Sequence, residues 1–326
     1  MSVKREDLLR VKVVDLDLKD VADEAGRYVD VLRRAGGFSG RYIVHAVDVL
    51  LKMFSEDAVV ILSFPANIVA TGLRGLLSSM VRSSMVDAVI TTGGTFDHDI
   101  ARGVGGDYYV GDFELDDVML KELEIHRLGN ILIPFENYGP LVERFVHEML
   151  EDISREKTAW KPSELAEACG TRLEDRYSIL RSSYERKVKV FSPGIVDSAF
   201  GTAIYTFNEI QRSRTNPTNI VVDVAGDMSV ISDLVLSADK LGGIMLGGGI
   251  SKHHLIWWSQ FRGGLDFAVS FTSAPEWDGS LSGARVREAI SWGKVKTTAA
   301  HVTVPGDLTV IFPFVIGYVA RELGFV

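Results

Sequence analysis

Apolar residues occur along the chain in two alternating patterns. Short, almost uninterrupted apolar runs rich in Val and Ile predict β-strands, and they lie at residues 58–62, 88–92, 131–133, 188–191, 220–224, 244–246, 267–271 and 302–304. Between them, apolar residues recur at three- and four-residue spacing and predict amphipathic helices, for example at 42–54, 73–85, 141–153 and 228–241. Strands without polar alternation are typical of a parallel sheet that is buried on both faces.

This alternation predicts an α/β fold with a doubly wound, mostly parallel, Rossmann-like sheet and helices on both faces. Residues 1–30 carry few strand signals, so we expect them to form an N-terminal arm or surface helices. Residues 31–326 are expected to form a single α/β domain. Within that domain, the charge-rich segment 152–186 is expected to be a helical excursion, and residues 212–219 an exposed loop.

The composition limits the environment and the kinds of partner. The single cysteine, Cys169, excludes an internal disulfide and a cysteine-rich zinc site, which fits a reducing cytoplasm. The first ten residues, MSVKREDLLR, lack the apolar core of a signal peptide, and no 18-residue uncharged run follows, so we expect a cytoplasmic protein without membrane contact. The net charge of −9 argues against nucleic-acid binding and is compatible with a cationic substrate.

The segment from Trp277 to Lys294 carries the most specific chemistry. Residues 284–292 are expected to form a helix that Ser282 caps and Gly293 ends, which would place Lys294 beside Trp292 at the helix end. A lysine attacks carbonyls and imines only as the neutral amine, and an apolar wall that excludes water favours that form. The alternative is an ordinary helix in which the tryptophan is a core residue and the lysine a C-terminal cap.

Four turns that follow predicted strands could hold a nucleotide, because the backbone approaches a pyrophosphate closely at such places. They lie at residues 63–68, 91–99, 246–250 and 271–274, and none has the G-x-G-x-x-G pattern. The third contains three consecutive glycines, residues 247–249, which leave room for a ligand because glycine has no Cβ. Each turn alone is more often a simple chain reversal, so the prediction depends on all four occurring together.

His253 and His254 form the other group with chemical content. Adjacent histidines cannot both face one ligand, and the lack of a His-x₃-His or cysteine partner nearby argues against a metal site. An imidazole can take a proton from an ammonium group, which suits His253 to amine chemistry. A Ser-His-Asp hydrolase would use the same histidine, but the sequence has no G-x-S-x-G turn to supply the nucleophile.

The pattern D-G-S-x-S-G-A-R-x-x-E-A-x-S-W-G-K at residues 278–294 resembles the active-site region of deoxyhypusine synthases, and the resemblance extends from Asp15 to the C-terminal helix. It implies an enzyme in which NAD oxidises spermidine and an aminobutyl imine passes to a lysine of the enzyme. The group is then delivered to a lysine of the translation initiation factor 5A precursor. The resemblance also implies a homotetramer with active sites at subunit contacts.

The resemblance assigns roles to individual positions of this chain. Catalysis falls on Lys294 and His253, and substrate binding on Glu288, Trp292, Gly279, Ser280, Leu281, Asp97 and His98. The NAD contacts fall on Ala66, Asn67, Ala70, Thr92, Gly93, Gly94, Asp197, Gly248, Ser273, Ala274 and Asp307. We expect no metal-binding residues.

The expected amine site departs from the family pattern. His98 replaces one of two consecutive acidic residues, and Thr202 and Leu281 each replace an aspartate. An unpaired buried ammonium is unfavourable, so compensating charge is expected from Asp97, Asp99, Glu288 or Asp278. We therefore expect intact hydride and imine chemistry with a shifted amine preference, and the sequence does not say which polyamine is preferred.

Two alternatives remain open from the sequence. One is an aminobutyl transferase whose acceptor is a free diamine, as in homospermidine synthesis. The other is a paralogue that keeps the fold without catalysis, against which the retention of Lys294, Trp292, Glu288 and His253 argues.

Overall fold

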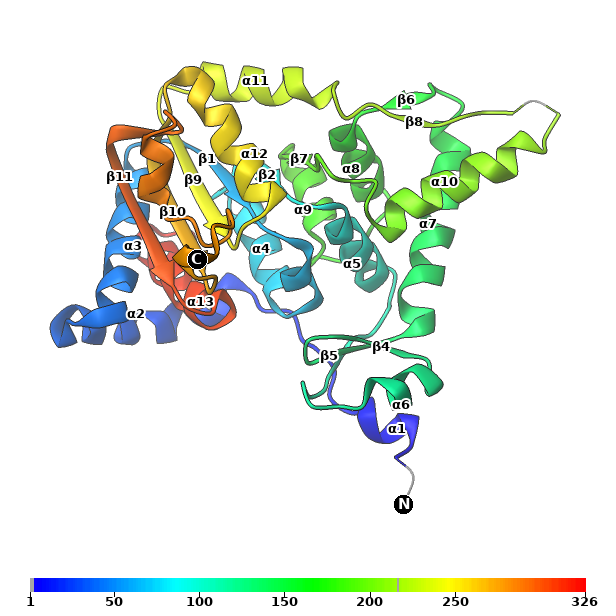
Figure 1. The fold of residues 1–326 in the computed structure, drawn as a ribbon, viewed down its shortest axis with the longest axis horizontal. Helices are drawn as coiled ribbons and strands as arrows, with labels where there is room; N and C mark the ends of the chain where they lie inside the picture. Colours follow the sequence, from blue (N-terminus) through cyan, green and yellow to red (C-terminus); the bar gives the residue numbers. More distant parts are fainter. Residues whose placement is uncertain (1–2, 216) are drawn as a thin grey trace.

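The computed structural model describes residues 3–215 and 217–326, and its centre is a six-stranded sheet (Figure 1). The strand order is β11-β10-β9-β1-β2-β7, and every neighbouring pair is parallel. The strands are β1 (Val59–Ser63), β2 (Ala88–Ile90), β7 (Lys189–Phe191), β9 (Leu241–Leu246), β10 (Leu265–Thr272) and β11 (Val295–Pro305). The predicted α/β fold with a mostly parallel sheet is therefore confirmed.

Alternate residues of each strand enter different hydrophobic clusters. In β1, Val60 and Leu62 pack on one side of the sheet and Ile61 packs on the other, and all three are at most 2% exposed. Burying such a side chain stabilises the fold by about 1.5–3 kcal/mol, so two-sided burial explains the nearly continuous apolar runs. The continuous apolar runs in the sequence therefore reflect burial on both faces, in addition to the intrinsic strand propensity of the residues.

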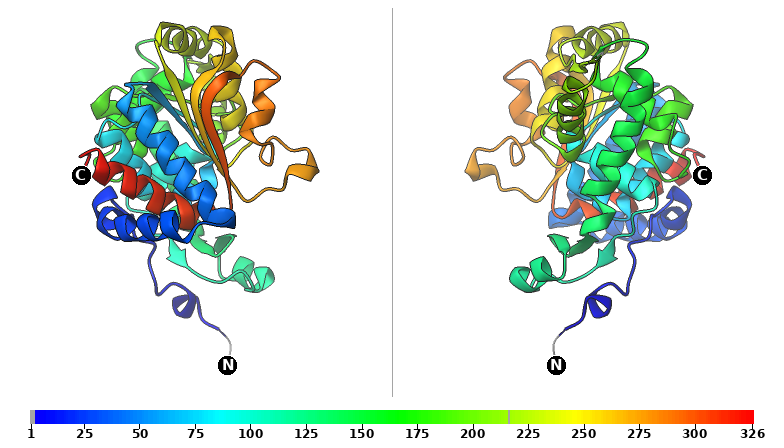
Figure 2. Two further views of the ribbon diagram at one scale, coloured as in Figure 1. Left: turned by 90° about the vertical axis from the view of Figure 1, so that its left-hand side faces the viewer. Right: turned by 90° about the vertical axis from the view of Figure 1, so that its right-hand side faces the viewer.

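Helices cover both faces of the sheet (Figure 2). One face is covered by α2 (Leu18–Ala35), α3 (Phe38–Ser55) and α13 (Leu308–Glu322), whose apolar residues form the larger cluster. The other is covered by α11 (Asp227–Ser237), α12 (Ile250–Ser259) and the 3-10 helix η5 (Val286–Ile290). The second face carries the site described below.

The β2 and β7 side of the sheet continues into further helices. They are α4 (Leu73–Arg82), α5 (Gly93–Gly103), α7 (Gly139–Ile153), α8 (Pro162–Gly170), α9 (Ile179–Arg186) and α10 (Ala199–Arg212), with short 3-10 turns η1 (Ala66–Ala70) and η2 (Phe135–Asn137). Two further 3-10 turns, η3 (Gln260–Arg262) and η4 (Glu276–Asp278), follow α12 and β10. Segment 152–186, expected to be helical, contains α8 and α9. The expected loop at 212–219 includes Asn216, which lies outside the described residues, and 213–215 and 217–219 contain no helix or strand.

Two predicted strands do not join the main sheet, which corrects the expectation of one sheet. Residues 131–133 belong to β5 (Ile131–Pro134), which pairs antiparallel with β4 (Ile125–Leu128) and β3 (Tyr109–Val110). Residues 220–224 contain only β8 (Val221–Val222), paired with β6 (Ala159–Trp160). The turn between β4 and β5 is Gly129-Asn130, and Gly129 has φ +62°. A two-residue turn of this kind is a hairpin signal that the sequence contains and that the apolar pattern alone misses.

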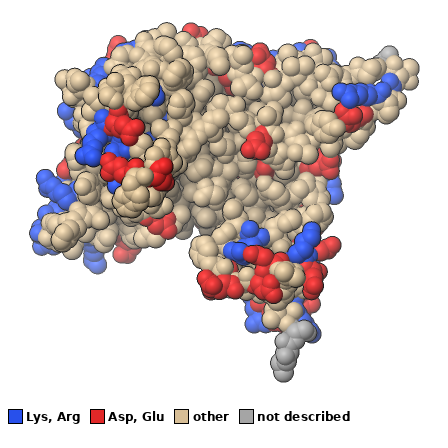
Figure 3. All heavy atoms as spheres, viewed as in Figure 1, with Lys and Arg blue, Asp and Glu red and all other residues tan. Residues whose placement is uncertain are grey.

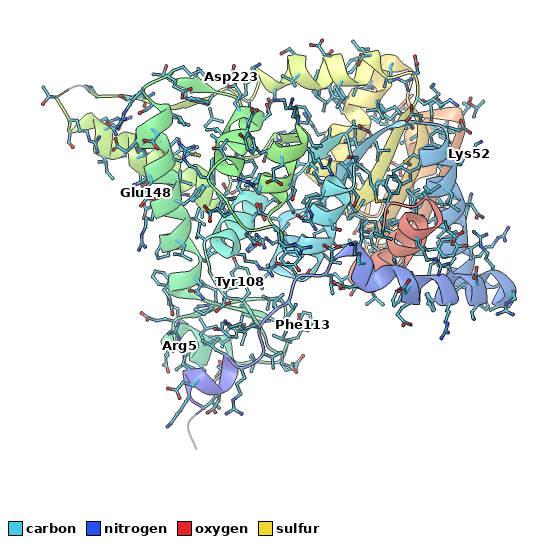
Figure 4. All side chains as sticks on the ribbon, turned by 180° about the vertical axis from the view of Figure 1, so that it is seen from behind. Arg5, Lys52, Tyr108, Phe113, Glu148 and Asp223 are labelled. Atoms are coloured by element: carbon cyan, nitrogen blue, oxygen red, sulfur yellow. The ribbon has the colours of Figure 1, made fainter. Side chains whose placement is uncertain are left out.

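The β3-β4-β5 sheet, α1 (Arg5–Leu8) and α6 (Asp117–Glu122) form a small lobe that projects from the molecule, and Figure 4 labels Arg5, Tyr108 and Phe113 in it. Arg5 makes an ion pair with Glu136 at 2.7 Å, which joins the N-terminal segment to the lobe. Charged side chains of both signs gather on the lobe, whereas the middle of the face in Figure 3 is mostly uncharged.

The N-terminal segment is in part tightly packed. The boundary expected at residue 30 falls inside α2, and Leu18 and Val29 of this helix are fully buried in the main core. Met1 and Ser2 of the expected arm lie outside the described residues. The division into residues 1–30 and 31–326 stays a prediction. Within the described ranges, the helices are all too short or too polar to cross a membrane.

A buried ionic cluster fastens the N-terminal segment to the helices beside β2. Arg74 of α4 is 1% exposed and pairs with Asp99 of α5 at 2.7 Å, with Asp15 at 2.9 Å and with Asp175 at 2.7 Å. Asp99 also accepts hydrogen bonds from the backbone N–H groups of residues 179 and 180, at the start of α9. Four segments distant in sequence therefore meet at one guanidinium.

Candidate active site

A cavity of about 310 Å³ opens on the α12 face of the sheet, between α12 and the chain that leads into β11. It is lined by Met245, Lys252, His253, Ile256, Trp257, Leu281, Ala284, Arg285, Val286, Glu288, Ala289, Trp292, Lys294 and Val295. Five of the residues that the sequence analysis singled out meet here: Lys294, His253, Glu288, Trp292 and Leu281.

Lys294 lies immediately before β11 and is 8% exposed. Its Nζ lies 4.9 Å from the ring centroid of Trp292 and 5.7 Å from that of Trp257. The backbone reaches this position through a turn in which the Lys294 N–H bonds the carbonyl of Ala289, and Gly293 adopts φ +68°, a conformation that favours glycine. The expected ending of the helical segment at Gly293 therefore corresponds to an actual left-handed turn.

The expected helix over 284–292 is wrong, because only Val286–Ile290 is helical and only as a 3-10 turn. Two tertiary hydrogen bonds explain the difference. The Val286 N–H donates to Thr303 Oγ1 of β11 at 2.9 Å, and Lys252 Nζ donates to the Ala284 carbonyl at 2.7 Å. Both backbone groups are thereby withdrawn from a helical ladder, and Ser282 caps no helix here.

Lys252 of α12 was not identified from the sequence, although it precedes the two histidines. It is 3% exposed, and its Nζ bonds both the Leu281 carbonyl at 2.9 Å and the Ala284 carbonyl at 2.7 Å. Burial lowers the pKa of Lys252 to about 8, opposed by the nearby Glu288 carboxylate. Lys252 thus attaches the cavity wall to α12.

His253 lines the cavity and stacks on Trp257, with ring centroids 5.6 Å apart and planes at 22°. Burial, with a smaller contribution from the positive charge of Lys294, lowers the pKa of His253 below its ordinary value. The ring is therefore neutral near pH 7 and able to accept a proton. His254 points elsewhere, edge-on to Trp258, and burial lowers its pKa to about 4.

The remaining expected amine-site residues are distributed differently. Gly279 and Ser280 lie in an exposed loop outside the cavity lining. Asp278 is also exposed, and its carboxylate accepts the N–H of Ser280 at 2.7 Å. Of the four carboxylates expected to supply compensating charge, Glu288 is the one that lines the cavity.

Asp97 and His98 lie on α5, away from this cavity within the chain. The Asp97 carboxylate accepts hydrogen bonds from the Tyr138 hydroxyl and from the N–H groups of residues 199 and 200, so it fixes the start of α10. His98 bonds the Tyr108 hydroxyl at 2.9 Å, and burial lowers its pKa to about 4. Asp99 belongs to the Arg74 cluster. Both expected substrate residues are held by other parts of the same chain.

The expected nucleotide turns follow β1, β2, β9 and β10, which are neighbours in the sheet. Because these strands are parallel, the turns lie at one edge. Thr92 Oγ1 accepts the Ala66 N–H at 3.2 Å, and a Cβ on Gly94 would stand 2.9 Å from the Ala66 Cβ. A Cβ on Gly248 would meet the Cα of Ser282 at 2.2 Å, so this glycine allows the cavity segment to approach β9.

The other expected cofactor residues occupy the same edge. They are Asn67 and Ala70 in η1, Gly93 at the start of α5, Asp197 after β7, Ser273 and Ala274 after β10, and Asp307 after β11. Asp197 and Asp307 are exposed, and Asp307 also caps α13 by accepting the N–H of residue 309. Whether these residues contact a cofactor stays a prediction.

Within residues 3–215 and 217–326, no group of three or more His, Cys, Asp or Glu side chains could hold a metal ion.

Trp257 is the second residue that the sequence analysis missed. A signal was present: His253, Trp257 and Phe261 follow at four-residue spacing, which places them on one side of α12 and η3. Each ring contacts the next one along the helix: His253 stacks on Trp257, and Trp257 meets Phe261 edge to face with centroids 6.1 Å apart.

Comparison with known proteins identifies the family of the chain. A family model for deoxyhypusine synthase matches residues 28–319. A probable deoxyhypusine synthase of Sulfolobus acidocaldarius is 49% identical over 311 residues, which cover 95% of this chain and 97% of the relative. One of Ignicoccus hospitalis is 49% identical over 316 residues, covering 96% and 97%.

The fold has a counterpart among solved structures. A crystal structure assigned as a deoxyhypusine synthase of Entamoeba histolytica superposes with a TM-score of 0.62 at 20% identity, covering 94% of this chain and 96% of the other. The resemblance drawn from residues 278–294 is therefore confirmed across nearly the full chain. The chain belongs to the deoxyhypusine synthase family.

Proposed function

We propose that this enzyme uses NAD to transfer the aminobutyl group of spermidine, through an imine on Lys294, to a lysine of the translation initiation factor 5A precursor. The observation that carries the proposal is the position of the Lys294 amine. It lines the cavity, is 8% exposed and lies near two indole rings, and no hydrogen bond or ion pair joins its Nζ to another described residue. An amine in such surroundings is available for covalent chemistry.

The turns at the carboxyl edge of the sheet fit a dinucleotide. Gly94 and Ala66 leave little side-chain bulk where two turns meet, and the first backbone N–H groups of α5 lack helical partners. These residues, with the turns after β9 and β10, would hold NAD. When bound, NAD would supply a hydride acceptor that later returns the hydride.

His253 is suited to the proton transfer that precedes hydride loss. The secondary amine of spermidine is an ammonium at neutral pH, and it must lose its proton before the adjacent carbon can become an imine carbon. The depressed pKa of His253 keeps its imidazole neutral and able to take this proton. Its position in the cavity lining beside Lys294 supports this role.

The covalent step is an exchange of one amine for another on the imine carbon. Neutral Lys294 adds to the imine carbon, the bond from that carbon to the diaminopropane nitrogen breaks, and 1,3-diaminopropane leaves with a proton. The aminobutyl carbon is now doubly bonded to Nζ of Lys294. The acceptor's lysine repeats the exchange, Lys294 is released as a free amine, and return of the hydride gives a secondary amine on the acceptor.

Trapping with borohydride tests this proposal directly. Enzyme incubated with NAD and spermidine and then reduced should carry a four-carbon amine adduct on Lys294, found by peptide mass mapping. Lys294→Ala should abolish both adduct and transfer while NAD binding persists. Lys296→Ala is the matched control, since Lys296 pairs with Asp266 outside the cavity lining, and it should retain activity. An adduct on another lysine, or transfer by Lys294→Ala, would refute the proposal.

The acceptor and the amine preference can be determined in the same system. Labelled spermidine should deliver label to the factor precursor, and label appearing only in free diamines would favour a homospermidine-type activity instead. The single lining carboxylate, Glu288, supports a shifted amine preference, so turnover should differ among shorter and longer polyamines. Equal turnover of all of them would refute a tuned amine site. A homotetramer is expected from family resemblance, and native mass spectrometry would measure it.

A further inference from the structure

The Lys294 amine is covered by two side chains that are themselves exposed. Trp292 is 65% exposed and Trp257 is 42% exposed, whereas Lys294 beneath them is 8% exposed. The two indoles therefore form the outer wall of the cavity at this point. Removing either ring would open the Nζ atom to solvent.

Trp257 is held in place by its neighbours on the helix. Its ring stacks on His253 on one side and meets Phe261 edge to face at 6.1 Å on the other. These contacts fix the ring over Lys294, with its centroid 5.7 Å from Nζ. A fixed wall is more effective than a mobile one, because an ordered ring leaves no room for water to reach the covered atom.

The charges of the cavity also point to the rings. Its described lining has three basic side chains, those of Lys252, Arg285 and Lys294, and the carboxylate of Glu288. Lys252 is bonded to two carbonyls and Arg285 to Glu276, while the two indole faces lie within 6 Å of Nζ. A protonated imine at this atom would face aromatic rings, which attract a cation without supplying water.

We infer that Trp257 is a further catalytic residue, which together with Trp292 shields the Lys294 imine from water so that the aminobutyl group passes to an amine and is not hydrolysed. The inference rests on the proposed function. In the side reaction, water adds to the imine carbon, the bond to Nζ breaks, and 4-aminobutanal leaves while Lys294 regains a free amine. The hydride taken from spermidine then stays on the cofactor, so each hydrolysis leaves one NADH.

Product partition tests the inference. Wild type, Trp257→Ala, Trp257→Phe and Trp277→Ala are incubated with NAD, spermidine and the factor precursor, and NADH, 4-aminobutanal and modified acceptor are quantified. Trp277 is the matched control, because it is 89% exposed and outside the cavity lining. In Trp257→Ala the ratio of aldehyde to transferred product should rise about ten-fold, with NADH matching aldehyde. Trp257→Phe should lie between wild type and Trp257→Ala, and Trp277→Ala should equal wild type.

A second measurement needs no cofactor or substrate. Acetylation of Lys294 by a limiting amine reagent, read against Lys296 in the same digest, should be several-fold faster in Trp257→Ala than in wild type or Trp277→Ala. Thermal melting establishes that each variant is folded, and Trp292→Ala replaces Trp257→Ala if the latter unfolds, with the same expected result.

The outcomes separate the two proposals. If wild type forms no adduct on Lys294, the proposed function fails. If wild type forms the adduct but Trp257→Ala shows wild-type partition and wild-type acetylation, the shielding role of Trp257 is overturned while the proposed function stands. If Trp257→Phe and Trp257→Ala gave the same ratio of aldehyde to transferred product, and both differed greatly from wild type, an aromatic ring at this position would give no protection. That result would also overturn the shielding role.

Discussion

Two buried basic side chains in this molecule have opposite surroundings. Arg74 is 1% exposed and meets three carboxylates, those of Asp15, Asp99 and Asp175, at 2.7 to 2.9 Å. Lys294 is 8% exposed, and the close partners of its Nζ among the described residues are two indole rings. The burial is similar, but Arg74 is paired with carboxylates, whereas Lys294 has no such partner among the described residues.

The difference in partners suits Arg74 to a structural role and Lys294 to a chemical one. A buried charge with matched partners holds segments together, and removing one partner leaves the others uncompensated. A buried amine without such partners contributes little to folding, and it is retained for what it can react with. This contrast can be tested through stability, through the cavity wall and through pH.

The largest expected effect is on stability at Arg74. Arg74→Met should lower the free energy of unfolding by about 3–5 kcal/mol, because it leaves the buried carboxylate of Asp99 without its cation and leaves Asp15 with Arg102 alone. Chemical denaturation measures this. Lys294→Met is the counterpart, and its unfolding free energy should equal or exceed that of wild type although its activity is lost. Comparable destabilisation by both substitutions would remove the distinction between the two sites.

A smaller effect is expected at Lys252, which combines features of both sites. It is buried in the active cavity, yet its Nζ is bonded to the carbonyls of Leu281 and Ala284. Lys252→Met should release the segment that carries Glu288 and lower kcat/KM by about 30-fold, since hydrogen bonds from a charged donor contribute about 1.5–3 kcal/mol each. Lys240→Met, on an ion pair with Glu56 outside the cavity lining, is the control and should leave kcat/KM unchanged.

The pKa of Lys252 gives that prediction a pH signature. Its folded-state pKa of about 8 lies below the ordinary 10.5, so the unfolded state binds more protons between these values. The stability of wild type relative to Lys252→Met should therefore rise as pH increases from 8 to 10.5. A fall over that window would contradict the buried position of the ammonium.

The smallest effect concerns His98, a buried neutral base. Its pKa is lowered to about 4 by burial and by the nearby Arg102, against 6.5 for an ordinary histidine. The unfolded state therefore binds the proton first, and stability should fall as pH decreases from 6.5 to 4. His98→Gln should lessen that loss, because glutamine takes up no proton in either state, and denaturation across this range measures the difference.

Much of the fold followed from the apolar pattern. The runs at 58–62, 88–92, 244–246 and 267–271 became four adjacent parallel strands, because two-sided burial requires continuous apolar residues. The pattern failed at 131–133 and 220–224, where short apolar runs pair outside the main sheet. Periodicity reports burial, and it does not report which strand is the neighbour.

The candidate site, like the fold, was predictable in part from the sequence. The pattern at residues 278–294 identified Lys294, Trp292 and Glu288, which share one cavity with His253. The expected helix at 284–292 failed because Thr303 and Lys252 bind its backbone from elsewhere in the chain. Lys252 and Trp257 were missed for the same reason, since the contacts of Lys252 lie 29 and 32 residues away in sequence and Trp257 contacts a residue of the next segment, Lys294.

The sequence alone determined the fold class and the family, and it predicts the reactive lysine, because each depends on a local pattern of residue types. Only the tertiary structure decided which charges are matched. Asp97 and Asp99 have the same chemical group as Glu288, yet the fold uses them to hold the starts of α10 and α9 and leaves Glu288 in the cavity. The physical reason is that the use of a charged side chain depends on the partners that packing brings within hydrogen-bond distance, and those partners come from distant parts of the chain.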